Sequence, residues 1–100
     1  MKSDTFDWKS GHVVFWDLEE IDEKTPLNVQ CDHLKEDLAQ IEYPNRILLD
    51  IGWYPSFDPK GRFTVTVVKD SDWDSPIFRS RARDLRSLKR LISRAISTFA

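Results

Sequence analysis

Five carboxylates lie within seven residues, directly after an aromatic side chain, and they form the densest charged group in the sequence. They are Asp17, Glu19, Glu20, Asp22 and Glu23, and the aromatic residue is Trp16. No histidine or tyrosine within the run provides a partner for general acid–base chemistry. Such a run can instead attract a basic protein and speed its association, with the tryptophan as an apolar anchor. The plainer alternative is a solvated loop, which is the usual setting for a run of charges.

A second acidic group has the D-x-D-x-D spacing that begins a calcium-binding EF-hand loop. It consists of Asp70, Asp72 and Asp74, with Trp73 between the last two. The match then fails, because Ser75 stands where that loop needs glycine and Arg81 stands where it needs a bidentate glutamate. The pattern therefore predicts an acidic hairpin turn, and Trp73 makes this turn a second candidate surface for a protein partner.

The residues that could bind a metal or act as a nucleophile are few. Cys31 and His33 form a C-x-H pair, and the only other histidine is His12. A structural zinc site needs four ligands, and a Cys–His nucleophile needs an orienting third group. The three glycines, at positions 11, 52 and 61, form neither a phosphate-binding loop nor a dinucleotide fingerprint. We therefore expect no metal, no cofactor and no enzymatic activity.

Basic residues concentrate at the other end of the sequence. Residues 1–60 hold 13 acidic and 6 basic side chains, whereas residues 61–100 hold 4 acidic and 9 basic ones. Arg79, Arg81 and Arg83 alternate along a predicted strand, and Arg86 and Arg90 follow on a predicted helix. Such a strip can contact nucleic-acid phosphates. The alternative is that these arginines pair with the acidic half of the molecule or are solvated, and the net charge of −2 favours it.

These residues must be positioned by a small set of elements. The β-branched and aromatic run at 13–16 predicts a strand. Leu34, Leu38 and Ile41 recur at helical spacing, which predicts a helix that begins at Asn28 or Asp32 and ends before Pro44. The apolar run at 47–54 and the alternating segments at 62–69 and 77–83 predict three further strands. Asp84 is expected to cap a helix whose apolar stripe runs from Leu85 to Phe99.

This order, β-α-β-β-β-α, predicts an α+β two-layer sandwich in which two helices cover one face of a mostly antiparallel four-stranded sheet. A βαβ crossover between the strands at 13–16 and 47–54 would make them parallel. The acidic run would then lie at the same end of the sheet as Phe57 and Asp58, with the turn at 70–74 at the opposite end. Trp53 and Trp73, which stand close to predicted turns, are expected to cover the core more than to form an interface.

Length and composition place the chain in a broad class. It has 100 residues, 40% of them hydrophobic and 12% aromatic, which predicts one ordered domain over residues 1–100. No apolar run approaches the ~20 residues of a membrane span, and the first residues lack the apolar core of a signal peptide. A single cysteine fits a reducing compartment. We therefore expect a cytoplasmic protein with no membrane partner and without the two-domain cleft of a large enzyme.

Three motifs stand out in the second half of the sequence: the strand end Gly52-Trp53-Tyr54-Pro55, the turn Asp58-Pro59-Lys60-Gly61-Arg62-Phe63 and the hairpin Asp72-Trp73-Asp74-Ser75-Pro76. Together they resemble the small cytosolic immunity proteins of bacterial polymorphic toxin and contact-dependent growth inhibition systems. The resemblance covers about residues 47–96. It implies a non-enzymatic inhibitor that binds a cognate toxin domain, often a nuclease, and blocks its active site or substrate groove.

The acidic surfaces agree with this implied role, because nuclease toxins are commonly basic. The residues expected to contact the toxin are the two acidic groups with their tryptophans: Trp16, Asp17, Glu19, Glu20, Asp22, Glu23, Asp70, Asp72, Trp73 and Asp74. The alternative function is a small nucleic-acid-binding module that uses Arg79, Arg81, Arg83, Arg86 and Arg90.

Overall fold

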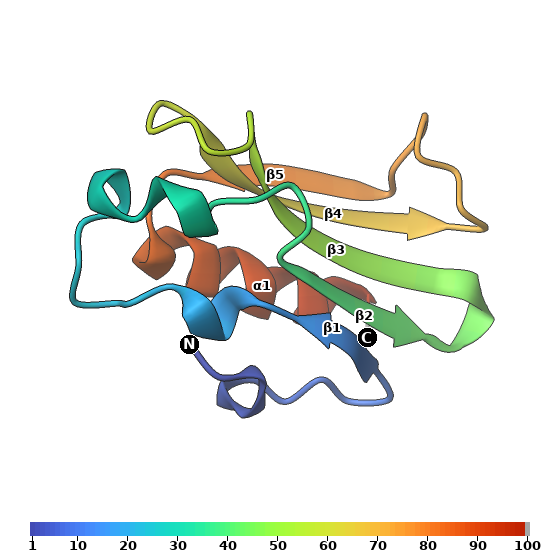
Figure 1. Cartoon of the computed structure of the whole chain (residues 1–100). Coiled ribbons are helices and arrows are strands. Elements are labelled where there is room, and N and C mark those ends of the chain that lie inside the picture. The colour runs from blue at the N-terminus through green and yellow to red at the C-terminus, as the bar shows by residue number, and fades with distance from the viewer. Residues whose placement is uncertain (100) are drawn as a thin grey trace.

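The chain folds into a five-stranded antiparallel sheet with one long helix across one of its faces (Figure 1). The computed structural model describes residues 1–99. Its strands are β1 (His12–Trp16), β2 (Ala39–Tyr43), β3 (Ile47–Tyr54), β4 (Arg62–Lys69) and β5 (Phe78–Ala82), and its helix is α1 (Leu85–Phe99). The strands pair in the order β1-β2-β3-β4-β5, so each is hydrogen-bonded to its neighbour in the sequence. The predicted α+β class is confirmed, whereas the prediction of four strands and two helices is wrong.

The strands predicted from strong patterns are present. The ranges 47–54 and 62–69 match β3 and β4, and the predicted strands at 13–16 and 77–83 overlap β1 and β5. In β4, Phe63, Val65 and Val67 are buried on the helix-covered face, because period-two alternation sends every second side chain to the same side. Short 3₁₀ helices lie before β1 and in the first two connections: η1 (Ser3–Thr5), η2 (Leu18–Glu20), η3 (Leu27–Val29), η4 (Cys31–His33) and η5 (Pro44–Arg46).

The predicted helix that ends before Pro44 is wrong. Leu34 and Leu38 are fully buried, but they lie in an irregular segment that leads into β2. In β2 itself, Ala39, Ile41 and Tyr43 are buried and alternate with two less buried polar residues. The apolar residues fit a helical spacing and a strand spacing equally well, and pairing with β3 along five residues decided between them.

The predicted crossover is also wrong, since β1 pairs antiparallel with β2 and is not adjacent to β3. Two antiparallel steps still give β1 and β3 the same direction. The acidic run after β1 and the loop after β3 therefore lie at the same end of the sheet, and the turn at 70–74 lies at the opposite end. Figure 1 shows this arrangement, with the chain between β1 and β2 and the yellow-green loop after β3 on the left.

The core lies between the sheet and α1. Leu88, Ile92 and Ala95 are fully buried on the sheet-facing side of α1, and the ring of Phe99 packs edge-on against Phe78 with 5.7 Å between centroids. Asp84 caps the helix as predicted, because its Oδ1 accepts a 2.8 Å hydrogen bond from the backbone N–H of Ser87. This hydrogen bond lowers the pKa of the Asp84 carboxyl.

No helix covers the outer face of the sheet within residues 1–99; instead the segment at 34–38 lies over one end of it (Figure 1). The backbone N–H of Leu38 donates to the carbonyl of Ile51 at 2.9 Å, and that of Trp53 donates to the carbonyl of Lys35 at 2.7 Å. Between these bonds the segment bulges over Gly52. No helix in the described chain has the length and apolar character to cross a bilayer.

Candidate functional site

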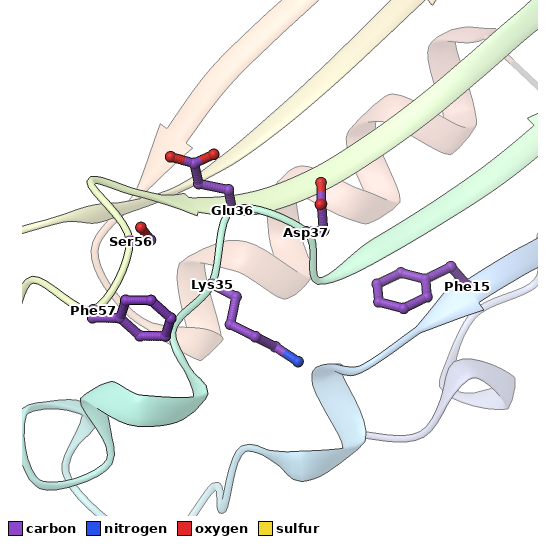
Figure 2. A pocket seen from close by; sticks show the side chains of 6 residues that line it. All are labelled: Phe15, Lys35, Glu36, Asp37, Ser56 and Phe57. Atoms are coloured by element: carbon purple, nitrogen blue, oxygen red, sulfur yellow. The ribbon is translucent and has the colours of Figure 1, made fainter.

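A shallow groove opens at the end of the sheet where β1 and β3 stop. It measures about 380 Å³, and its lining residues are Phe15, Lys35, Glu36, Asp37, Ser56 and Phe57 (Figure 2). A neighbouring depression shares Phe15 and Asp37 with this groove and adds Val14 and Gln40. We call the two together the acidic groove. Figure 2 shows Phe57 and Phe15 at its two ends, with Lys35, Glu36 and Asp37 between them.

Two hydrogen bonds hold the Phe57 end of the acidic groove in place. The backbone N–H of Phe57 donates to the carbonyl of Leu34 at 2.7 Å, and the indole Nε1 of Trp53 donates to the carbonyl of Asp58 at 2.8 Å. These two bonds tie the loop after β3 both to the segment at 34–38 and to the core. The side chain of Phe57 is nevertheless 56% exposed, which places an apolar ring in solvent beside carboxylates.

Lys35 pairs with acids of the run at 17–23 and not with Glu36 or Asp37, its neighbours in the wall of the acidic groove. Its Nζ lies 2.6 Å from Oδ2 of Asp17 and 3.7 Å from Oε2 of Glu20, and the bond to Asp17 raises the pKa of the lysine. In Figure 2 this amine points toward the turn after β1, away from Glu36 and Asp37. Among residues 1–99 no ion pair involves Glu36 or Asp37, so both keep their charge available to a partner.

The predicted acidic run lies next to the acidic groove, and its charges are only partly neutralised. Glu23 pairs with the Nζ of Lys89 at 2.5 Å, which lowers the pKa of the glutamate. Asp22 is exposed and accepts a 2.7 Å hydrogen bond from Thr25 within its own turn, which lowers its pKa. Glu19 is exposed and has no ion pair in the described part of the chain. The paired acids of the run therefore form ion pairs with lysines, the amino terminus and a histidine, and within residues 1–99 none of them pairs with an arginine.

Trp16 does not stand free beside these acids. Its ring packs against Trp8 with 5.6 Å between centroids, and its Nε1 donates to the carbonyl of Met1 at 2.9 Å. The exposed aromatic residue next to the carboxylates is Phe57, which the sequence argument placed at this end but did not assign to the partner surface. Its turn motif, with Pro55 and Pro59 on either side, was the available signal.

The second predicted surface lies apart from the first. The turn after β4 carries Asp70, which pairs with Arg46 at 3.3 Å, and Asp72 and Asp74, which are exposed. Trp73 is 49% exposed, so the expectation that it covers the core is wrong, whereas Trp53 is 2% exposed and fulfils it. The structure does not bring the two acidic groups together.

The side chain of Asp50, on the outer face of β3, is almost completely buried. It is 5% exposed, and its Oδ1 accepts a 3.1 Å hydrogen bond from Nε2 of Gln40 in the wall of the acidic groove. Burial raises the pKa of the Asp50 carboxyl, and the negative charge of Asp37 raises it further. The folded protein therefore binds this proton more tightly than the unfolded chain does, so ionisation of Asp50 reduces stability as the pH rises.

Asp50→Asn is expected to stabilise the protein by about 1 kcal/mol at neutral pH, since the amide keeps an acceptor for Gln40 and carries no buried charge. The gain is expected to vanish in acid, below the ordinary aspartate pKa of about 3.9, where Asp50 is protonated in both states. Urea unfolding at the two pH values measures the difference. Equal gains in stability at neutral and acid pH would show that packing, and not ionisation, causes the effect. Asp72→Asn, in the exposed turn, is the control.

The remaining candidate chemistry finds little support in the described residues. No group of three or more histidine, cysteine or acidic side chains in residues 1–99 could hold a metal ion. The Sγ of Cys31 lies 3.4 Å from the carbonyl of Asn28, while His33 lies beside Glu20 and Asp32. Comparison of the chain with protein-family models, with curated proteins and with solved structures gave no match.

Proposed function

We propose that this protein is a non-enzymatic inhibitor that binds a basic protein at the acidic groove and the adjoining residues 17–23. The resemblance to immunity proteins makes a bacterial toxin domain, and a nuclease in particular, the proposed partner. The observation that carries the proposal is the exposed ring of Phe57 beside two carboxylates, Glu36 and Asp37, that have no cationic partner in the described chain.

The physical argument has two parts. Unpaired carboxylates at one end of a small protein attract a positively charged partner and orient it during the encounter. An exposed aromatic ring among them loses water when the complex forms, which slows dissociation. If these acids were all paired with arginines of the same chain, the electrostatic attraction of the partner would be lost. Within residues 1–99, however, Glu19, Glu36 and Asp37 form no ion pair.

The test has two steps: the neighbouring genes are searched for a toxin domain, and the association of that domain with this protein is then measured. Phe57→Ala is expected to weaken binding about 30-fold, mainly through faster dissociation, since an anchor residue contributes ~2 kcal/mol or more. The triple reversal of Glu19, Glu36 and Asp37 to lysine is expected to slow association about tenfold at low salt, with a smaller effect as salt is added. Surface-based kinetic measurements report both rate constants.

The matched controls lie at the opposite end of the sheet. Trp73→Ala and Asp72→Lys make the same kinds of change on the second acidic surface and are expected to leave both rate constants within about twofold. Weaker binding from these two variants, with no effect from the groove variants, would move the interface to the turn after β4. Unchanged binding in all four would refute the proposal.

One observation supports nucleic-acid binding as a second candidate function. Arg79, Arg81, Arg83, Arg86 and Arg90 are all exposed, and none forms an ion pair within residues 1–99. These arginines are therefore not paired with the acidic half of the described chain. The unpaired carboxylates at the same end of the sheet weaken this function, because they repel a phosphate backbone.

A further inference from the structure

Three arginines converge at the corner where β4 begins, β5 ends and α1 begins. Arg62, Arg81 and Arg83 line a depression of about 410 Å³, together with Ala82 and Ser87. Thr64 pairs with Arg81 and Phe63 pairs with Ala82, so Arg62 and Arg83 are the next residues at this end of the two strands, Arg83 being the first residue after β5. Like charges gathered at the end of a strand pair destabilise it, so this arrangement has a cost when no anion is present.

Within residues 1–99 no carboxylate forms an ion pair with these arginines. Arg62 is held at the rim, because its Nη1 donates to the carbonyls of Lys60 at 3.1 Å and Gly61 at 2.8 Å. Arg81 and Arg83 are exposed and form no ion pair within residues 1–99. The remaining N–H groups of the three guanidinium groups are therefore free to bind a ligand.

The nearest acid in the sequence is already engaged. Asp84 accepts the 2.8 Å hydrogen bond from the backbone N–H of Ser87, and this bond is the main reason for its lowered pKa. Its carboxylate thus caps α1. The positive charges of Arg83 and Arg86 lower its pKa further, but within residues 1–99 it forms an ion pair with neither. The 15-residue helix adds the positive end of its dipole on the side of Ser87, which strengthens the attraction of the three arginines for an anion.

We propose that this corner is a binding site for a phosphate group, and we call it the arginine corner. Guanidinium groups present paired N–H donors that match phosphate oxygens in two-point contacts, and several of them around one depression favour a doubly charged anion over chloride. The ligand class is a phosphate ester, either an isolated group on a small molecule or one phosphate of a nucleic-acid strand. The site does not depend on the proposed inhibitor function, since it uses none of the acidic groove.

Titration with inorganic phosphate, followed by amide NMR, tests the arginine corner directly. Saturable shifts are expected in residues 81–87, against a chloride titration at equal ionic strength. The double variant Arg81→Gln/Arg83→Gln is expected to weaken binding about tenfold, because each charge-assisted contact contributes ~1.5 kcal/mol or more. Arg94→Gln, an exposed arginine further along α1, is the matched control and is expected to change binding less than about twofold.

The double variant has a second readout that separates binding from folding. In chloride it is expected to be slightly more stable than the natural protein, because it relieves the repulsion across β4 and β5, while in phosphate this order is expected to reverse. Shifts that rise linearly without saturation, or that are equally reduced in Arg94→Gln, would overturn the site.

A short single-stranded RNA identifies the source of the phosphate. The arginine corner would be assigned to a nucleic-acid strand if the RNA binds more tightly than inorganic phosphate and if the double variant loses this binding. The logarithm of the RNA affinity would then fall with the logarithm of the salt concentration, with a slope of about −0.7 per phosphate contacted. RNA binding no tighter than that of phosphate would assign it to isolated phosphate esters.

Discussion

Gly52→Ala is expected to destabilise the protein by about 3 kcal/mol, at the upper end of the cost of overpacking. A Cβ at this position would lie 1.9 Å from the carbonyl oxygen of Glu36, which is backbone and cannot rotate away. The segment at 34–38 would have to lift from β3 and release its hydrogen bonds to Ile51 and Trp53. Because this segment carries Glu36 and Asp37, the same variant is expected to disorder the acidic groove.

Thermal unfolding followed by circular dichroism measures the loss, and amide hydrogen exchange at Leu38 and Trp53 shows whether the segment has lifted. Thr66→Ala, half-buried on the same face of β4, is a control that adds no atom beneath the segment. A Gly52→Ala protein with natural stability and natural protection at these two amides would show that the segment does not lie over β3.

Trp53→Ala is expected to cost about 3–5 kcal/mol, the usual range for deleting a large buried aromatic side chain. The ring is 2% exposed and meets Phe63 edge-on with 4.8 Å between centroids. Its Nε1 also holds the carbonyl of Asp58, and so fixes the loop that carries Phe57. Trp53→Phe keeps much of the packing but loses this hydrogen bond, and is expected to cost less while loosening the loop.

Urea unfolding followed by far-ultraviolet circular dichroism is the suitable measurement, because it does not depend on tryptophan fluorescence. Trp73→Ala removes the same side chain from an exposed turn and is expected to change stability by no more than about 0.5 kcal/mol. Similar losses at the two positions would contradict the different burial that the structure gives them.

The fold was predictable where the pattern of apolar residues fitted only a strand or only a helix. The alternation of Phe63, Val65 and Val67 with threonines fits a strand and no helix, and β4 has the predicted bounds. The spacing of Leu34, Leu38 and Ile41 fitted both periods, and the deciding contact was with β3. Pro44 was interpreted as the end of a helix, but it follows the strand β2, because the residue before a proline favours an extended backbone.

From the sequence, the acids next to the acidic groove were identified as candidates, but Glu36 and Asp37, the carboxylates in its wall, were not. The clustering of Glu19 and Glu20 is visible in the sequence, but whether each acid is paired depends on Lys35, which lies far along the chain. Phe57 is exposed because two hydrogen bonds hold its loop, one from its own backbone N–H to the carbonyl of Leu34 and one from the indole of Trp53 to the carbonyl of Asp58. Such long-range contacts leave no local pattern. Sequence reasoning therefore favoured Trp16, whose type suits an interface but whose ring is partly buried against Trp8 and the core.

The order of the strands has a consequence for synthesis on the ribosome. Each strand pairs with the one made just before it, so the pairs β2–β3, β3–β4 and β4–β5 can form across short connections as the chain emerges, whereas the β1–β2 pair has to close the long connection of residues 17–38. The apolar face of the sheet nevertheless has to wait for α1, the last element in the order, before it is shielded from water. Until then the nascent sheet exposes an apolar surface that favours aggregation. A chain halted before α1 is therefore expected to bind chaperones.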